Sequence, residues 1–149
     1  MIEGVIIKKL QRFPDERGWL AEFWRSDEDA YRPVMGYVSK TETGVIRGPH
    51  EHRAQADGFV FAGPGNFILY LWENRSGAPH YRQEQSLEVG EDNPVLVIVP
   101  PGVVHGYKCV KGPAYSFNLA DRLYRGEGKK EEVDEIRWEK DPDSPFKIE

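Results

Sequence analysis

The sequence predicts an all-β fold, a sandwich or jelly roll, formed by one domain. Short segments rich in Val, Ile, Phe and Tyr are separated by Gly, Pro, Asn and Asp at the spacing of an antiparallel sheet. The chain has 149 residues, a length that suits one domain with a sizeable buried core. No internal repeat or low-complexity linker divides it, so we expect a single domain over residues 1–149.

The strand candidates follow one another along most of the chain. They are Val5–Leu10, Trp19–Arg25, Val34–Lys40, Gly44–Arg47, Gly58–Phe61, Phe67–Glu73, Gln83–Leu87, Val95–Val99, Val104–Val110 and Ala114–Leu119. Phe67–Glu73 alternates aromatic and aliphatic residues, which is typical of a core strand packed on both faces. Helical character is confined to Asp27–Tyr31, where Ser26 is a candidate N-cap, and to the charged segment Lys129–Arg137. We therefore expect a β fold with a short C-terminal helical segment.

Composition and charge exclude several functional classes. The net charge is −5, and the basic residues are scattered among carboxylates, so no basic stripe is available to bind nucleic acid. No apolar run approaches the roughly 20 residues of a membrane helix. The start of the chain lacks the features of a signal peptide, and the single Cys109 cannot form an internal disulfide. We expect a cytoplasmic protein that binds neither nucleic acid nor membrane.

Three of the four histidines lie in two short motifs. His50 and His52 are one residue apart in an extended segment, so both side chains project from the same face of the strand. Asp57 follows five residues later, and His105 follows the turn at Pro101-Gly102. Because histidine transfers protons near neutral pH and binds metals, the clustering predicts a functional site.

The spacing of these residues is similar to that of the two cupin motifs. The first comprises Gly44, His50, His52, Asp57 and Gly63, and the second Pro100, Gly102 and His105. Asp replaces the usual Glu of the first motif, and its last gap is one residue short. The resemblance implies a double-stranded β-helix, or jelly roll, in which the three histidines meet inside the barrel.

Further matches resemble a particular family within the cupins, the dTDP-4-dehydrorhamnose 3,5-epimerases. In chain order the matching residues are Phe13, Asp15, Arg17, Gly18, Leu20, Glu22 and Phe23, then Gly44–Gly48 and His50, then Pro101, Gly102, His105 and Gly106, and finally Tyr124, Ile136, Trp138, Asp141 and Pro142. Their order and spacing hold across most of the chain. The resemblance implies a homodimer, in which Val5–Lys8 joins the partner's sheet, and a role in polysaccharide biosynthesis.

The resemblance also implies proton transfer beside the C4 ketone of a dTDP-4-keto-6-deoxyhexose, without a cofactor. His50 matches the catalytic base of the family, and Asp141 matches the aspartate that orients its imidazole, although the gap from Trp138 is one residue longer than in the family. Other matches imply contacts with the sugar nucleotide, and they are Arg17, Glu22, Arg47, His105, Asn118 and Tyr124. The planar guanidinium groups suit diphosphate oxygens, and Tyr124 matches a tyrosine that stacks on the nucleotide base.

Three positions depart from the family. Asp57 stands where the family carries a lysine that stabilises the enolate oxygen, and a carboxylate would oppose that charge. Asn118 stands where the family has its general-acid tyrosine, and Tyr115 does not replace it because strand alternation places residue 115 on the opposite face. His52 replaces the usual glutamine. The motifs therefore do not predict a complete double epimerase of the standard type.

These departures leave other functions open. One is a metal-dependent cupin, an isomerase or dioxygenase, that binds one divalent transition metal through His50, His52, Asp57 and His105. Pairing of Asp57 with Arg53 or Arg47 would instead give a polar barrel without metal. A sugar 3,4-ketoisomerase has a similar histidine motif but does not share the terminal motifs. A non-catalytic barrel that binds a sugar nucleotide is the remaining alternative.

Overall fold

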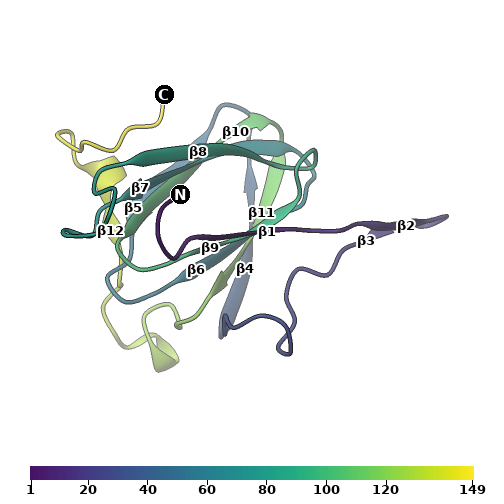
Figure 1. The fold of residues 1–149 in the computed structure, drawn as a ribbon, viewed down its shortest axis with the longest axis horizontal. Coiled ribbons are helices and arrows are strands. Elements are labelled where there is room, and N and C mark those ends of the chain that lie inside the picture. The colour runs from purple at the N-terminus through teal and green to yellow at the C-terminus, as the bar shows by residue number, and fades with distance from the viewer.

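Two antiparallel five-stranded sheets face each other in the computed structural model, which describes residues 1–149 (Figure 1). One sheet has the order β1-β9-β6-β11-β4, and its strands are Ile6–Lys9, Val95–Val99, Asp57–Phe61, Ala114–Ala120 and Met35–Thr41. The other has the order β12-β5-β10-β7-β8, with strands Ile136–Arg137, Ile46–Glu51, Val103–Lys111, Asn66–Glu73 and Glu84–Gly90. The predicted all-β jelly-roll fold is confirmed.

The hydrophobic core fills one part of the space between the two sheets. Its aromatic centre contains Phe59, Phe61, Phe67 and Tyr107, whose rings pack edge to face and stacked at centroid distances between 5.1 and 5.9 Å. Such aromatic pairs add stability beyond their buried area. Strand β7 packs on both faces as predicted: Phe67, Leu69 and Leu71 are buried in this core, while Trp72 on the other face packs in a second cluster beside the half-buried Tyr70. The other part of the interior is lined by polar side chains.

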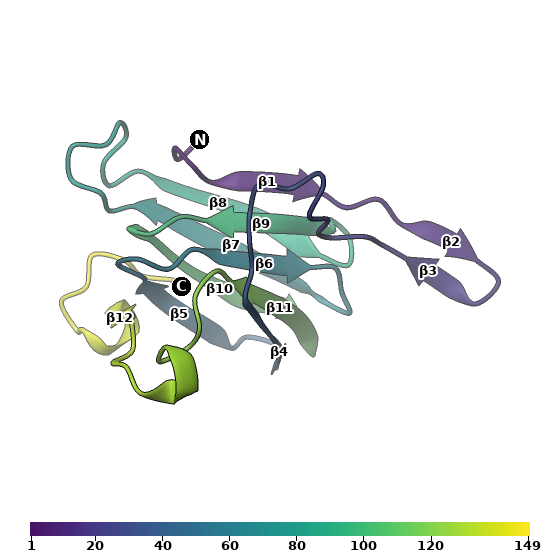
Figure 2. The same ribbon diagram turned by 90° about the horizontal axis from the view of Figure 1, so that it is seen from below.

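The N-terminal region differs from the prediction in two ways. Strand β1 pairs with β9 of its own chain, from Ile6 opposite Ile98 to Lys9 opposite Val95, and so completes its own sheet. The strand expected at Trp19–Arg25 is wrong, because only Gly18–Leu20 (β3) is extended, and it pairs with Phe13–Asp15 (β2). The β2–β3 hairpin projects away from both sheets (Figure 2). Its exposed apolar side chains are Phe13, Trp19 and Leu20.

Both predicted helical segments are wrong. Asp27–Tyr31 contains only a turn, in which the N–H groups of Glu28 and Asp29 bond to the carbonyl of Arg25. The helical pattern does not continue, and the side chain of Arg32 binds the carbonyls of Asp29 and Tyr31 instead. In the segment Lys129–Arg137, only Ile136–Arg137 forms a strand, and residues 130–135 have no regular secondary structure. Only short 3₁₀ turns occur near it, at Glu127–Lys129 and Trp138–Lys140.

The C-terminal segment is extended because it pairs with the central part of the molecule. Strand β12 places Ile136 opposite Glu51 and Arg137 opposite His50 at the edge of the second sheet. Phe146 then packs on Trp72 and Trp138, which fixes the end of the chain. The polar C-terminal region therefore closes one side of the histidine motif. No helix in the structure has the length and apolar character needed to cross a membrane.

Candidate active site

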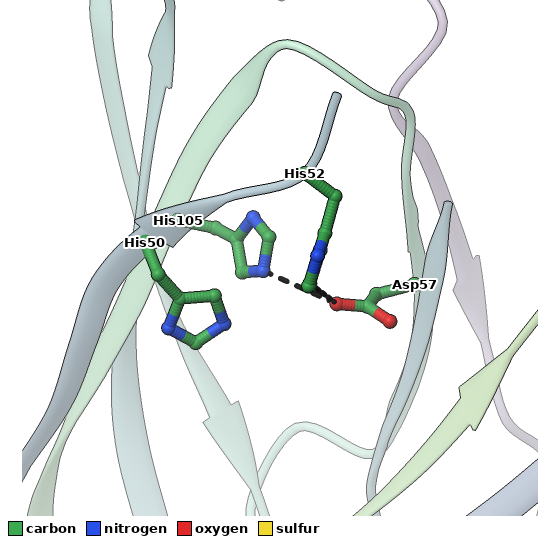
Figure 3. A group of neighbouring side chains, drawn as sticks. All are labelled: His50, His52, Asp57 and His105. Atoms are coloured by element: carbon green, nitrogen blue, oxygen red, sulfur yellow. Dashed lines mark ion pairs between the residues drawn. The ribbon is translucent and has the colours of Figure 1, made fainter. Parts of the chain in front are cut away.

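Three imidazoles and one carboxylate meet between the two sheets (Figure 3). His50 on β5 and His105 on β10 are register partners, and His52 follows the end of β5. Asp57 begins β6 of the opposite sheet. The potential ligand atoms of the four residues all lie within 4.8 Å of one another, so residues from both sequence motifs form one site.

Two glycines allow β5 and β10 to approach closely at this point. Gly48 has a φ of +81°, and a Cβ there would lie 2.8 Å from the carbonyl oxygen of His105. A Cβ at Gly106 would lie 2.8 Å from the carbonyl oxygen of Arg47. The register between β5 and β10 shifts between His105 and Tyr107. Side chains larger than hydrogen would therefore push apart the two strands that carry His50 and His105.

Asp57 bridges the two sheets through the histidines. Its Oδ2 atom lies 2.9 Å from Nε2 of His52 and 3.4 Å from Nε2 of His105, while Gln55 donates to its Oδ1 atom at 2.8 Å. The side chain of Asp57 is buried, and Nδ1 of His52 contacts the carbonyl oxygen of Asp134. The alternative in which Asp57 pairs with Arg53 or Arg47 is therefore wrong.

The charge state of this pair follows from opposing effects. Burial disfavours both charged forms, but the hydrogen bond and charge of Asp57 outweigh it and raise the pKa of His52 to about 9. Burial likewise opposes ionisation of Asp57, yet its bonds to His105 and His52 keep the pKa of the carboxyl well below its usual range. At neutral pH the pair is an imidazolium and a carboxylate, whose charges cancel.

His50 has a different environment from the other two histidines. Its ring makes no side-chain hydrogen bond within the protein, although its centroid lies 4.5 Å from that of His105 in an edge-on arrangement. Burial lowers the pKa of His50 to about 2, and the neighbouring histidines add to the effect. His50 is therefore neutral at physiological pH, and its unpaired ring nitrogen can accept a proton from a bound molecule.

An open cavity of about 1020 Å³ leads to His50 and His52. Its volume is at the upper end of the range typical of small-molecule sites. Two tyrosines, Tyr37 and Tyr124, line the cavity. Its lining also includes the cations Arg122 and Arg125, and Arg137, which is the register partner of His50. The cavity thus combines aromatic surfaces, cations and a neutral imidazole.

The family model described as dTDP-4-dehydrorhamnose 3,5-epimerase matches residues 1–146. The chain belongs to this family. The resemblance predicted from the motifs is thereby confirmed over nearly the whole chain, and the protein is a member of a family of sugar-nucleotide epimerases.

Curated relatives of this epimerase-family protein act in polysaccharide or glycan biosynthesis. A spore coat polysaccharide biosynthesis protein of Bacillus subtilis is 37% identical over 111 residues, which cover 74% of this chain and 73% of the relative. A probable low-salt glycan biosynthesis epimerase of Haloferax volcanii is 33% identical over 135 residues, covering 88% and 86% of the two chains. Both similarities extend across most of the epimerase-family domain.

Solved structures confirm the fold of the family member. A dTDP sugar isomerase from Desulfovibrio desulfuricans has a TM-score of 0.83 at 22% identity, covering 98% of this chain and 91% of the other. The epimerase of Legionella pneumophila in complex with dTDP-4-keto-L-rhamnose has a TM-score of 0.77 at 22% identity, covering 92% of this chain and 73% of the other. Each of these two structures therefore superimposes on almost all of this chain.

The structure places the remaining predicted family residues in different regions. Asn118 is buried on β11, and its Oδ1 atom has no hydrogen-bond partner. Arg47 on β5 donates to Thr41 and to a backbone carbonyl. Asp141 is exposed and accepts the backbone N–H of Asp143, and no hydrogen bond joins it to His50.

Arg17 and Glu22 of the family motif lie away from the cavity. Arg17, at the turn of the projecting hairpin, pairs with Asp15, and Glu22 lies 3.5 Å from Arg25. Neither side chain lines the cavity that contains His50. One chain alone therefore does not bring the N-terminal motif to the histidine cluster.

Sequence reasoning missed two residues of the site. Asp134 lies in the charged segment Lys129–Arg137 that was predicted to be helical, yet its carboxylate accepts the backbone N–H groups of Arg53, Ala54 and Gln55 at 2.9 Å. It thereby holds the loop between His52 and Asp57. Tyr37 was only one residue of a predicted strand, but it lines the cavity. Its position opposite Asn118 in the sheet was the signal that could have identified it.

Proposed function

We propose that this protein epimerises a dTDP-linked 4-keto-6-deoxyhexose, with His50 as the base that removes a proton beside the C4 ketone. The observation that carries the proposal is the state of His50, a neutral ring without a hydrogen-bond partner that lines a large cavity. It occupies the base position of the family motif. Relatives crystallised with dTDP-quinovose and dTDP-4-keto-L-rhamnose support the choice of ligand.

The chemistry requires a positioned base more than a cofactor. A ketone acidifies the protons on adjacent carbons because the electron pair released on deprotonation moves into an enolate. A base in hydrogen-bond reach of such a proton contributes typically 10²–10⁴-fold to the rate. The sheltered, largely protein-lined position of His50 keeps it neutral and ready to accept that proton.

Of the other family positions, Tyr124 lines the cavity, and its exposed side chain can stack on the nucleotide base. His105 and Asn118 are buried and do not line the cavity. We assign Arg47 to the diphosphate or sugar. Asp141 stays a prediction as the partner of His50, supported by its place just beyond Arg137, the register partner of that base.

Product analysis tests the proposal. Purified protein is incubated with dTDP-4-keto-6-deoxyhexose, the products are reduced, and the resulting sugars are separated by configuration. We expect a sugar inverted at one or both carbons beside the former ketone. Tight binding of dTDP-sugar without any inverted product would instead support the non-catalytic binding barrel.

We also propose that the active unit is a homodimer in which the projecting hairpin of one chain completes the cavity of the other. Arg17 and Glu22 match substrate-binding positions of the family, but they lie on or beside a hairpin that extends away from their own cavity (Figure 2). The exposed Phe13, Trp19 and Leu20 give this hairpin an apolar surface to bury.

Light scattering with Trp19→Glu tests the dimer. We expect wild-type protein to have twice the mass of one chain, and the variant to be a monomer with weakened dTDP binding. Lys130→Glu, which changes an exposed residue elsewhere, is the matched control. Monomeric wild-type protein that binds dTDP would contradict the proposal.

A metal-dependent reaction at the same residues is the second candidate. Four potential ligand atoms converge within 4.8 Å, and the buried Nε2 atom of His105 has no good hydrogen-bond partner. His50, His52, Asp57 and His105 would hold a divalent transition metal, which would polarise a carbonyl or enolate oxygen. The Asp57–His52 ion pair, however, already neutralises the carboxylate without metal.

Elemental analysis distinguishes the two candidates. Inductively coupled plasma mass spectrometry is applied to wild-type protein and to the His52→Ala/Asp57→Ala double variant. Stoichiometric metal that is lost in the variant would favour the metal-dependent reaction. Epimerisation by protein that contains less than about a tenth of an equivalent of metal would favour proton transfer by His50 alone.

A further inference from the structure

The side chain of Tyr37 is the neighbour, on the adjacent strand, of the position where the family carries its general-acid tyrosine. Asn118 on β11 occupies the position of the general-acid tyrosine, and its register partner on the neighbouring strand β4 is Tyr37. Directly opposed residues in an antiparallel pair project from the same face, with Cβ atoms about 5 Å apart. The side chain of Tyr37 therefore starts one strand away from the place of the missing tyrosine.

The alternation of β11 identifies the face on which Tyr37 lies. Ala114, Ser116 and Asn118 are buried, and the hydroxyl of Ser116 bonds to Tyr107 in the interior at 3.0 Å. Phe117, between them, is exposed on the outer face. Because Tyr37 is the register partner of Asn118, its side chain starts from the interior face, and it lines the cavity that also contains His50. Tyr37 is 52% exposed, so its side chain lies in the open part of this cavity and is not packed in the core.

His50 and Tyr37 belong to opposite sheets. His50 lies on β5, in the sheet β12-β5-β10-β7-β8, whereas Tyr37 lies on β4, at the edge of the facing sheet. A sugar ring held between the sheets would therefore present one face to the imidazole and the other to the phenol. Inversion of a carbon requires this arrangement, since the proton must leave from one face and return to the other.

We propose that Tyr37 is the proton donor that replaces the acid missing at Asn118, an inference that rests on the proposed function. His50 takes a proton from the carbon beside the ketone, and the C–H electron pair forms the enolate. The O–H of Tyr37 then protonates that carbon from the opposite face, and the enolate electrons restore the C=O bond. The imidazolium releases a proton to solvent and the phenolate regains one, so no net proton is gained or lost.

Two features of Tyr37 suit this role. Its hydroxyl makes no hydrogen bond within the protein, so it is available to a ligand. Loss of hydration in the cavity, followed by the charge of Asp57 and by Tyr107, raises the pKa of Tyr37, which keeps its proton in place at neutral pH. Tyr107, the other interior tyrosine nearby, is bound to Ser116 and buried in the core.

Tyr37→Phe tests the proposal, with Tyr115→Phe as the control. The control removes the same hydroxyl from the adjacent strand, on the face opposite Asn118. Each protein is incubated with dTDP-4-keto-6-deoxyhexose in D₂O, and two quantities are measured by NMR: deuterium in the uninverted substrate and the amount of inverted product. Thermal midpoints and dTDP affinity are recorded for each variant.

We expect Tyr37→Phe to uncouple the two quantities. Inverted product falls at least about 100-fold, the lower end of general-acid contributions, while deuterium continues to enter the uninverted substrate through His50. Tyr115→Phe behaves as wild type. Inversion at the wild-type rate in Tyr37→Phe, or an equal loss of exchange and inversion, would overturn the donor role. A wild-type protein that neither exchanges nor inverts would overturn the proposed function itself.

Discussion

The two sheets contribute differently to the site. The sheet that contains β5 and β10 carries His50, Arg47 and His105, all of which match the epimerase family. The facing sheet carries Asp57 on β6, Asn118 on β11 and Tyr37 on β4, and the first two depart from the family. His50, the proposed base, is thus retained on one side together with Arg47 and His105, and only His52, directly after β5, departs there. The groups on the facing sheet have changed.

We propose that these departures are compensated by neighbouring residues. Asp57 would be an uncompensated buried charge if His52 were the usual glutamine, but the two form an ion pair at 2.9 Å. Asn118 removes a phenol from β11, and Tyr37 places one on the adjacent strand. A change at Asp57 or Asn118 therefore requires a matching residue beside it. Restoring the family residue at one position alone should destabilise the protein or lower its activity.

The largest effect on activity is expected from His50→Asn, in the sheet whose residues match the family. Because the variant keeps a polar side chain but loses the basic ring, turnover of dTDP-4-keto-6-deoxyhexose should fall by about 10²–10⁴-fold. Binding of dTDP should be unchanged. Chromatographic separation of the epimeric products measures the rate. His80→Asn, in an exposed turn, is the control, and equal turnover in both variants would contradict the role of His50.

Asp57→Lys restores the family's residue on the changed side. The new ammonium would lie beside two imidazoles at a position where the native side chain is 2% exposed, so we expect a loss of about 3–5 kcal/mol in unfolding free energy. Urea denaturation measures it. His52→Gln/Asp57→Lys should recover part of the loss. A stable single variant would show that the two positions are independent.

Asp134→Ala should have a smaller effect on stability. The variant removes the acceptor of three backbone N–H groups, of which only that of Gln55 is partly sheltered, so we expect a loss of about 1–3 kcal/mol. Glu132→Ala, an exposed carboxylate in the same acidic run, is the matched control in urea denaturation. Equal midpoints for the two variants would show that Asp134 does not hold the loop.

An effect of similar size is expected to depend on pH. The pKa of His52 is raised from 6.5 to about 9, so its stabilising contribution is complete below pH 6.5 and is lost as the pH rises through 9. His50, with its pKa lowered to about 2, acts in the opposite sense and disfavours folding below pH 6.5. In EDTA, the thermal midpoint of wild type relative to His52→Gln should decrease between pH 6.5 and 9. A constant difference would contradict the ion pair.

Local sequence patterns predicted most of the strands and the position of the histidine cluster. Continuous apolar runs placed Phe67–Glu73 and Val95–Val99 correctly, because burial of a strand determines both its composition and its conformation. His50, His52, Asp57 and His105 converge as the cupin spacing implied.

Contacts between distant segments explain what the sequence did not show. The segment around Asp134 has helical composition but is not helical, because its carboxylate and β12 bind the histidine segment more than 70 residues earlier. Tyr37 has no motif of its own and is identified only by its register with Asn118. We propose that the hairpin with Arg17 binds a second chain, and the sequence pattern of one chain does not specify such a contact.

Proton NMR of dTDP-4-keto-6-deoxyhexose in D₂O, with metal-free wild-type protein, tests the central claim most directly. The account predicts that the signal of a proton beside the ketone disappears as deuterium replaces it, and that this exchange requires His50. Unchanged signals after prolonged incubation with protein that binds the nucleotide sugar would contradict proton abstraction by His50.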